Sequence, residues 1–110
     1  MKISWQTQEN GETYIFVDKE NDGNPIGTCR KTLSNGKFAW EIIPWFDTWG
    51  MDSRDFKELF YSDIEAGRKL AHLYARASAI EAKRLKYRSK SVNVDDIFAD
   101  VDAWVGYSSD

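Results

Sequence analysis

The residues of this chain whose types could support acid–base or nucleophilic chemistry are few and far apart. His72 is the single histidine, and in a helix its neighbours four positions away are Arg68 and Arg76, which oppose its protonation and cannot orient it as a general base. Cys29 is the single cysteine and has no histidine near it in the sequence, so we expect a small strand residue rather than a nucleophile. No catalytic constellation is predicted, and we expect that the chain is not an enzyme.

Residues 18–23 place oxygen-bearing side chains at alternate positions before Gly23, as in the first half of an EF-hand calcium loop. The twelfth position of such a loop needs a bidentate Glu, and Cys29 stands there. The flanking residues have the pattern of strands, so a polar hairpin turn is expected instead. There is also no Gly-rich phosphate loop and no His/Cys metal spacing, so no cofactor is predicted.

Four short runs with strand character come first in the chain. They are residues 2–8, residues 13–17, residues 26–33 and a run in which Phe38, Trp40 and Ile42 alternate. Asx-Gly dipeptides, which tolerate the positive φ angles of tight hairpins, separate the runs at residues 10–11, 22–23 and 35–36. The pattern predicts an antiparallel four-stranded β-meander over residues 2–43.

A long helix is expected after the sheet. Ser62 and Glu65 have the spacing of a capping box, which starts a helix at residue 63. Only Gly67 opposes it, so it is expected to end near residue 89. Small residues recur every four positions and form a ridge that lets the helix lie close to a bulky sheet: Gly67, Ala71, Ala75 and Ala79. Residues 1–90 are therefore predicted to be one α+β domain, with the sheet packed on one long helix.

The connection between sheet and helix, residues 44–61, is long and rich in aromatic side chains. Connections of this length without structure are uncommon and are often functional. Ser53 is expected to cap a short helix over residues 54–60. Trp45, Phe46 and Trp49 form a lid over the core if they are buried, and a partner-binding patch if they are exposed.

Residues 91–110 form an acidic amphipathic segment. We expect Asn93 to cap a short C-terminal helix with Asp95 and Asp96 in its first turn. Its apolar stripe either packs on its own domain or inserts into a groove on a protein partner, with the large aromatic residues as anchors. The stripe consists of Val94, Ile97, Phe98, Val101, Trp104 and Val105.

The net charge of −3 hides a strong segregation along the chain. Residues 1–61 carry −3, residues 62–90 carry +5 and residues 91–110 carry −5. Such a chain either neutralises itself internally or offers a charged face to a partner. The basic end of the long helix is the alternative site, where cations would follow a nucleic-acid backbone. Its residues are Lys83, Arg84, Lys86, Tyr87, Arg88 and Lys90.

Spaced residues, chiefly Gly and Trp, form a pattern over about residues 5–79. They are Trp5, Gly11, Tyr14, Val17, Gly27, Gly36, Trp40, Gly50 and the Glu65-Ala66 helix opening. This pattern resembles small β-meander-plus-helix proteins of phages and prophages, most of which lack assigned functions. The resemblance implies the fold and a mobile-element origin, and it carries no site residues.

Together these features favour a binding protein. We expect a cytoplasmic protein with no membrane contact, because the chain has a lone cysteine, no signal pattern and no long apolar run. It is expected to be a monomer or a homodimer. We expect a non-enzymatic protein-binding module, a phage or prophage accessory protein that binds and modulates or inhibits a host protein in the host cytoplasm. The alternative is a nucleic-acid-binding protein that uses residues 83–90.

Overall fold

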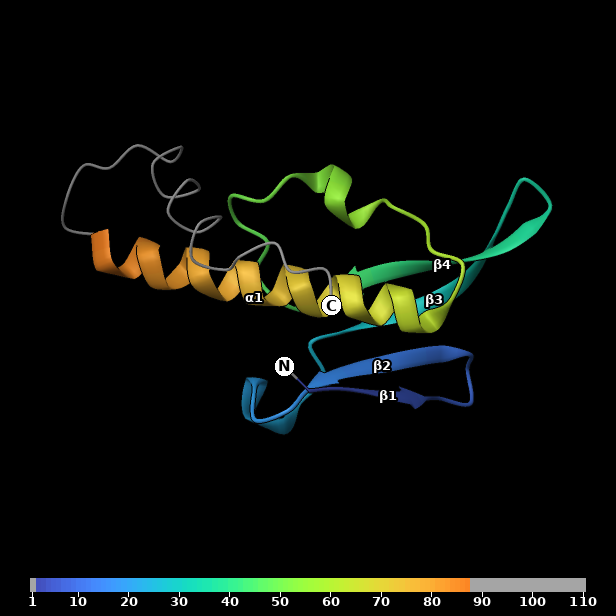
Figure 1. Ribbon diagram of the computed structural model, residues 1–110, viewed down its shortest axis with the longest axis horizontal. Helices are drawn as coiled ribbons and strands as arrows, with labels where there is room; N and C mark the ends of the chain where they lie inside the picture. Colours follow the sequence, from blue (N-terminus) through green and yellow to red (C-terminus); the bar gives the residue numbers. More distant parts are fainter. Residues whose placement is uncertain (1, 88–110) are drawn as a thin grey trace.

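The computed structural model of the chain describes residues 2–87, in which four strands are followed by one long helix. In chain order the elements are β1 (Ile3–Thr7), β2 (Glu12–Val17), the 3-10 turn η1 (Asn21–Gly23), β3 (Gly27–Ser34), β4 (Lys37–Pro44), the 3-10 turn η2 (Ser53–Phe56) and α1 (Asp63–Tyr87). α1 lies along one face of the sheet (Figure 1) and contacts all four strands. The predicted α+β architecture is confirmed, and the predicted C-terminal helix lies outside the described residues.

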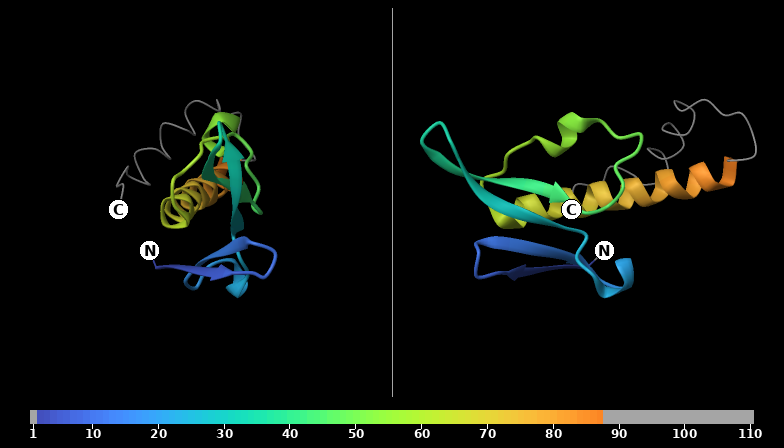
Figure 2. Two further views of the ribbon diagram at one scale, coloured as in Figure 1. Left: turned by 90° about the vertical axis from the view of Figure 1, so that its right-hand side faces the viewer. Right: turned by 180° about the vertical axis from the view of Figure 1, so that it is seen from behind.

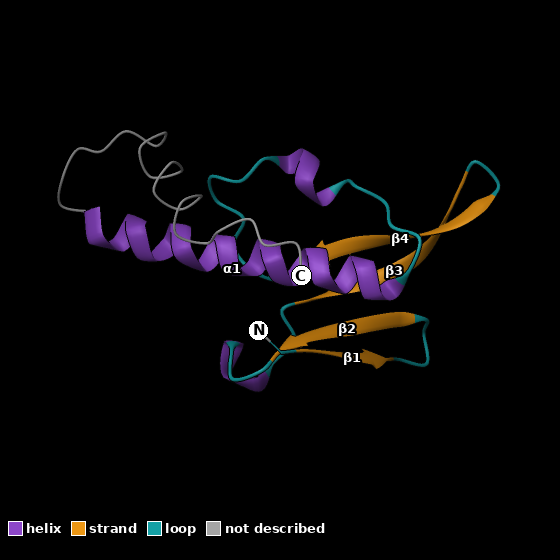
Figure 3. Cartoon of the chain, viewed as in Figure 1, coloured by secondary structure: helices purple, strands orange, loops and turns teal. Residues whose placement is uncertain are grey.

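The sheet is an antiparallel meander in the order β1-β2-β3-β4 (Figure 3). Each strand therefore pairs with its neighbour in the sequence, as the Asx-Gly turns predict. The β3–β4 turn shows why this dipeptide is needed, because Asn35 and Gly36 have φ angles of 53° and 76°. A two-residue hairpin turn of this kind requires positive φ at both central positions.

The core lies between α1 and the face of the sheet that it covers, which we call the inner face. β2 supplies its centre, because Thr13, Ile15 and Val17 are buried while the residues between them are only half-buried. Cross-strand pairing continues this face onto the neighbouring strands, with Trp5 opposite Ile15 and Cys29 opposite Thr13. The helix side of the core consists of Ala66, Leu70, Ala71 and Leu73.

The start of α1 is fixed by its capping residues and by Trp5. The Glu65 backbone N–H donates to Ser62 Oγ at 3.1 Å, which confirms Ser62 as the N-cap. The reciprocal half of the predicted capping box differs, because Glu65 Oε2 accepts from the Tyr61 N–H at 3.3 Å rather than from that of Ser62. The Trp5 indole Nε1 donates to the Asp63 carbonyl oxygen at 2.9 Å. Any Cβ at Gly67 would collide with this indole ring. The glycine thus lets the helix approach β1 closely.

The connection after β4 returns along the outer edge of that strand. Trp40 and Phe60 exchange two backbone hydrogen bonds of 2.7 and 2.9 Å. The prediction of a Ser53-capped helix over residues 54–60 is wrong: the helical turn is η2, and its cap is Asp52, whose side chain accepts from the Arg54 N–H at 2.9 Å. The chain leaves the turn early because it must be extended to form the bridge at Phe60.

Two segments extend beyond the rest of the sheet, in opposite directions. The β3–β4 hairpin extends past the start of α1, and the C-terminal half of α1 extends past the other end of the sheet (Figures 1 and 2). Within residues 2–87, no helix is both long enough and apolar enough to cross a membrane.

Candidate interaction surfaces

The first candidate surface is an aromatic patch on the face of the sheet opposite α1, which we call the outer patch. Tyr14 and Ile43 both lie beside Thr28 in the strand register, and the Trp45 ring packs edge-on against Tyr14, with centroids 5.2 Å apart at 65°. Phe16 follows Tyr14 on the same face of β2. The outer patch therefore consists of Tyr14, Phe16, Ile43 and Trp45.

The outer patch is packed against the sheet and is partly open to water. The Trp45 N–H donates to the Ile26 carbonyl at 3.0 Å, so its backbone continues the pairing of the sheet. Thr28 is 1% exposed and forms the floor of the patch, whereas the Trp45 side chain is 50% exposed. The outer face of an antiparallel sheet is usually polar, so three aromatic residues here mark a candidate binding surface.

Phe46 faces the opposite way from Trp45 and belongs to the core. Its ring lies 6.3 Å from Phe56 and 5.5 Å from Tyr74, both in edge-on geometry. It is half-buried and packs against the main hydrophobic cluster. Of the two roles that the sequence leaves open, the structure gives Phe46 that of a lid over the core.

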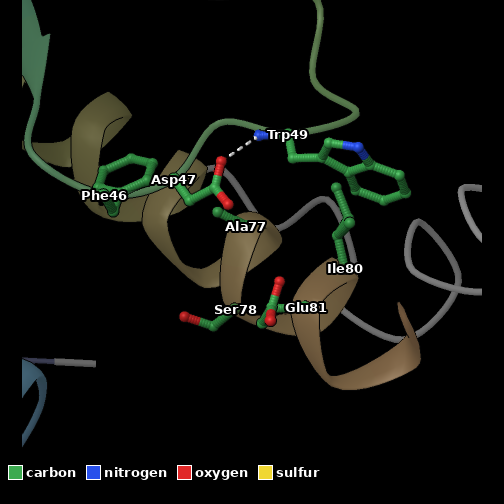
Figure 4. Close-up of a pocket in the computed structure, with 7 residues that line it drawn as sticks. All are labelled: Phe46, Asp47, Trp49, Ala77, Ser78, Ile80 and Glu81. Carbon is green, nitrogen blue, oxygen red and sulfur yellow. Dashed lines mark hydrogen bonds between the residues drawn. The ribbon is translucent and has the colours of Figure 1, made fainter. Parts of the chain in front are cut away.

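Trp49 lies over the second half of α1, beside a pocket of 380 Å³ (Figure 4). Its backbone N–H donates to Asp47 Oδ1 at 2.9 Å, which closes a tight turn within the loop. The Trp49 side chain is 39% exposed, and the Arg84 guanidinium lies 4.9 Å from its ring centroid. The pocket is lined by Phe46, Asp47, Trp49, Ala77, Ser78, Ile80 and Glu81.

The three aromatic residues of the connection that were candidates from the sequence thus lie in three environments. Trp45 lies on the outer face, Phe46 in the core and Trp49 on the helix. They do not form the single patch that their nearness in sequence suggests. The predicted partner-binding residues Asp95, Asp96, Ile97, Phe98, Val101 and Trp104 lie outside the described residues.

The alternative nucleic-acid site is described only in part, because it spans the end of α1. Arg84 stacks on Trp49 and forms an ion pair with Glu81, so its charge is already engaged within the chain. The hydrogen bond that this guanidinium donates to the Glu81 carboxylate is the main reason that its pKa is raised. Lys83, Lys86 and Tyr87 belong to the last turns of α1, and Arg88 and Lys90 lie outside the described residues.

A further surface, absent from the sequence-based candidates, is the tip of the β3–β4 hairpin. Leu33 and Phe38 face each other across it and are 64% and 68% exposed. The Lys31 ammonium lies 5.2 Å from the Phe38 ring centroid and 5.6 Å from that of Trp40. The basic Arg30-Lys31 pair was the available signal, but only the strand pairing shows that these side chains gather at a projecting tip.

The two titratable groups singled out in the sequence, Cys29 and His72, are both uncharged at neutral pH. Burial raises the pKa of the Cys29 thiol to about 11, with the nearby Asp63 carboxylate adding to the effect, so the thiol stays protonated. His72 is half-buried, as expected for a boundary position. Burial, and then the charges of Lys69 and Arg76, lower its pKa, so the imidazole is neutral at pH 7.

The EF-hand-like segment is a polar turn between β2 and β3, as predicted. The Asn21 side-chain amide donates to the Pro25 carbonyl at 2.9 Å and closes the loop. Across residues 2–87, no three His, Cys, Asp or Glu side chains converge so as to hold a metal ion. Comparisons of the chain with protein-family models, with curated proteins and with solved structures found no significant match.

Proposed function

We propose that this chain is a non-enzymatic protein-binding module and that the outer patch is its docking surface. The observation that carries the proposal is the environment of Trp45, whose side chain is half exposed while its ring packs against Tyr14 and its backbone N–H bonds to Ile26. Binding loses less free energy when the contact residues are ordered in advance. Large aromatic residues also dominate the energetics of protein interfaces.

The partner that fits best is a host protein, and the mode of action is occlusion. The pattern of Gly and Trp residues resembles phage and prophage accessory proteins, which favours a host target in the host cytoplasm. The acidic segment 91–110 would supply a second contact, with Phe98 and Trp104 as anchors and Asp95 and Asp96 facing a basic groove. Covering such a groove would block its access to nucleic acid.

The test is affinity capture from host lysate with the full chain, followed by the same capture with two variants. Trp45→Ala removes the exposed ring of the outer patch. Tyr61→Ala is the matched control, because Tyr61 is an aromatic residue that is 87% exposed and lies outside the patch. We expect the same host protein to be captured by the wild type and by Tyr61→Ala, and to be lost with Trp45→Ala when all three are equally folded.

Two outcomes would contradict this function. Capture that survives Trp45→Ala would remove the outer patch as the docking surface. Capture that disappears after nuclease treatment would show that nucleic acid mediates it, which favours the alternative function.

The alternative function, nucleic-acid binding at residues 83–90, is favoured by one observation. The half of α1 that ends there extends beyond the end of the sheet, so the strands do not cover it (Figure 1). Binding through phosphate contacts weakens steeply as salt rises, whereas binding through aromatic burial depends on salt much less. A salt titration of Lys83→Gln/Lys86→Gln beside the wild type therefore separates the two functions.

A further inference from the structure

The tip of the β3–β4 hairpin extends beyond the end of β2, and within residues 2–87 only Trp40 at its base is bridged to another segment, at Phe60. β2 pairs with β3 only from Gly27 to Arg30, whereas the pairing of β3 with β4 continues to Ser34 and Lys37. At about 3.3 Å per residue, the last four residues of β3 extend about 13 Å beyond the end of β2. Figures 1 and 2 show this two-stranded ribbon, residues 31–34 and 37–40, reaching past the start of α1.

Within the ribbon, side chains of the two strands contact each other. The tight turn at Asn35 and Gly36 fixes the register. Lys31 lies beside the rings of both Phe38 and Trp40. A ligand that uses Phe38 would therefore meet a ring whose position is constrained, which lowers the entropic cost of binding.

The ribbon is positive in a region of the chain that is negative overall. Residues 30–40 contain three cations and neither Asp nor Glu, although residues 1–61 sum to −3. Arg30 at its base forms an ion pair with Glu41, so Lys31 and Lys37 are the cations of the tip. Because the tip extends beyond β2, its two ammonium groups lie away from the acidic side chains in the rest of residues 1–61.

The exposure of Phe38 points to a ligand with a flat apolar face. Phe38 is 68% exposed, more than Trp45 or Trp49, and Leu33 opposite it is 64% exposed. The Lys31 ammonium lies beside this ring, and Lys37, the next residue along the strand, carries a second cation on the other face of the ribbon. A ring with a cation on either side of the strand suits a nucleobase flanked by phosphates. In a duplex the bases are stacked on each other, whereas a single strand offers their faces to aromatic side chains.

We propose that the β3–β4 ribbon binds single-stranded nucleic acid, with Phe38 stacking on a base and Lys31 and Lys37 contacting the flanking phosphates. This activity goes beyond the protein-binding function and does not depend on it, since the ribbon shares no residue with the outer patch. The ribbon is also distinct from the basic end of α1.

The test is fluorescence anisotropy with the full chain and two labelled probes, a short mixed-sequence single-stranded DNA and its duplex, at several salt concentrations. We expect the single strand to bind more tightly than the duplex. Phe38→Ala should weaken binding to the single strand about tenfold. Lys31→Gln/Lys37→Gln should lower the salt slope by about 1.4, because each phosphate contact on a single strand contributes about 0.7.

Matched controls separate the ribbon from general effects. Tyr61→Ala and Lys57→Gln remove an exposed ring and an exposed cation outside the ribbon and should leave binding unchanged. Phe38→Trp keeps an aromatic face and should retain binding, whereas Phe38→Leu keeps only apolar bulk and should lose it. Circular dichroism and thermal unfolding of each variant verify that the domain is folded.

Three outcomes would overturn the assignment. The first is that the single strand does not bind at low salt, or binds no better than the duplex. The second is that Phe38→Ala and Phe38→Leu bind as tightly as the wild type. The third is that Lys83→Gln/Lys86→Gln abolishes binding while the ribbon variants do not, which would place nucleic acid on α1 instead.

Discussion

On the inner face of the sheet, Trp5 packs beneath α1 and donates its indole hydrogen to the Asp63 carbonyl, whereas on the outer face Trp45 rests on Tyr14 with half of its surface in water. Both faces are rich in apolar and aromatic side chains, but only one is covered by the long helix. An aromatic residue on the covered face stabilises the fold. On the open face the same type of residue is available to a partner.

The largest expected effect is a loss of stability when a residue of the inner face is truncated. Leu70 is fully buried between α1 and the sheet, so Leu70→Ala should lower the free energy of unfolding by about 2–5 kcal/mol. Leu85→Ala is the control on the same helix, because Leu85 is 53% exposed and should cost less than about 1 kcal/mol. Chemical denaturation measures both, and equal effects would mean that α1 does not cover the sheet as described.

The next effect is a dependence on pH that also comes from the inner face. Burial raises the pKa of the Cys29 thiol from 9.0 to about 11, so the folded chain holds this proton more tightly than the unfolded chain does. The stabilisation is complete below pH 9 and is lost as the pH rises toward about 11, amounting to about 2–3 kcal/mol. Denaturation curves of the wild type and of Cys29→Ala should therefore converge over this range, and a constant difference between them would contradict burial of the thiol.

A smaller effect is expected where α1 approaches β1. Gly67→Ala would normally stabilise a helix by about 1 kcal/mol, but here the added methyl group meets the Trp5 ring. We expect a net loss of about 1–3 kcal/mol, as for other overpacked sites. In Trp5→Phe the same substitution should cost less, because the smaller ring leaves room, and a double-mutant cycle of denaturation measurements would show the coupling. A stabilised Gly67→Ala would contradict the close approach.

The smallest effect belongs to the polar end of the outer face. Arg30 donates to Glu41 through Nε at 2.7 Å, and the two side chains are 53% and 31% exposed. An ion pair this close to water contributes about 0–1 kcal/mol, so Glu41→Gln should leave thermal stability almost unchanged. A large loss in a melting experiment would show that the outer face helps to hold the fold.

The fold follows from local signals that agree with one another. The Asx-Gly dipeptide at Asn35 and Gly36, alternation along the strands, and the Ser62–Glu65 capping pair each act over a few residues. Because each strand pairs with its sequence neighbour, these local signals are enough to predict the order of the sheet and the position of the helix.

The candidate surfaces depend on packing and could not be predicted in the same way. Trp45 and Phe46 are adjacent and must point to opposite sides of the chain, but the position of α1 decides which of them is buried. The ribbon, residues 31–34 and 37–40, forms because β3 continues beyond the residues that pair with β2. The point where this pairing ends depends on how the strands align in the folded sheet. The charge of residues 1–61, taken as a sum, also conceals the positive tip.

The central claim is that the outer patch is the docking surface, and titration calorimetry with the purified host protein recovered by capture tests it most directly. The wild type, Trp45→Ala and Tyr61→Ala would be measured side by side. The account predicts that Trp45→Ala weakens binding by about 2 kcal/mol or more, as for an interface hot spot, while Tyr61→Ala binds like the wild type. Equal affinity of Trp45→Ala and the wild type would contradict it.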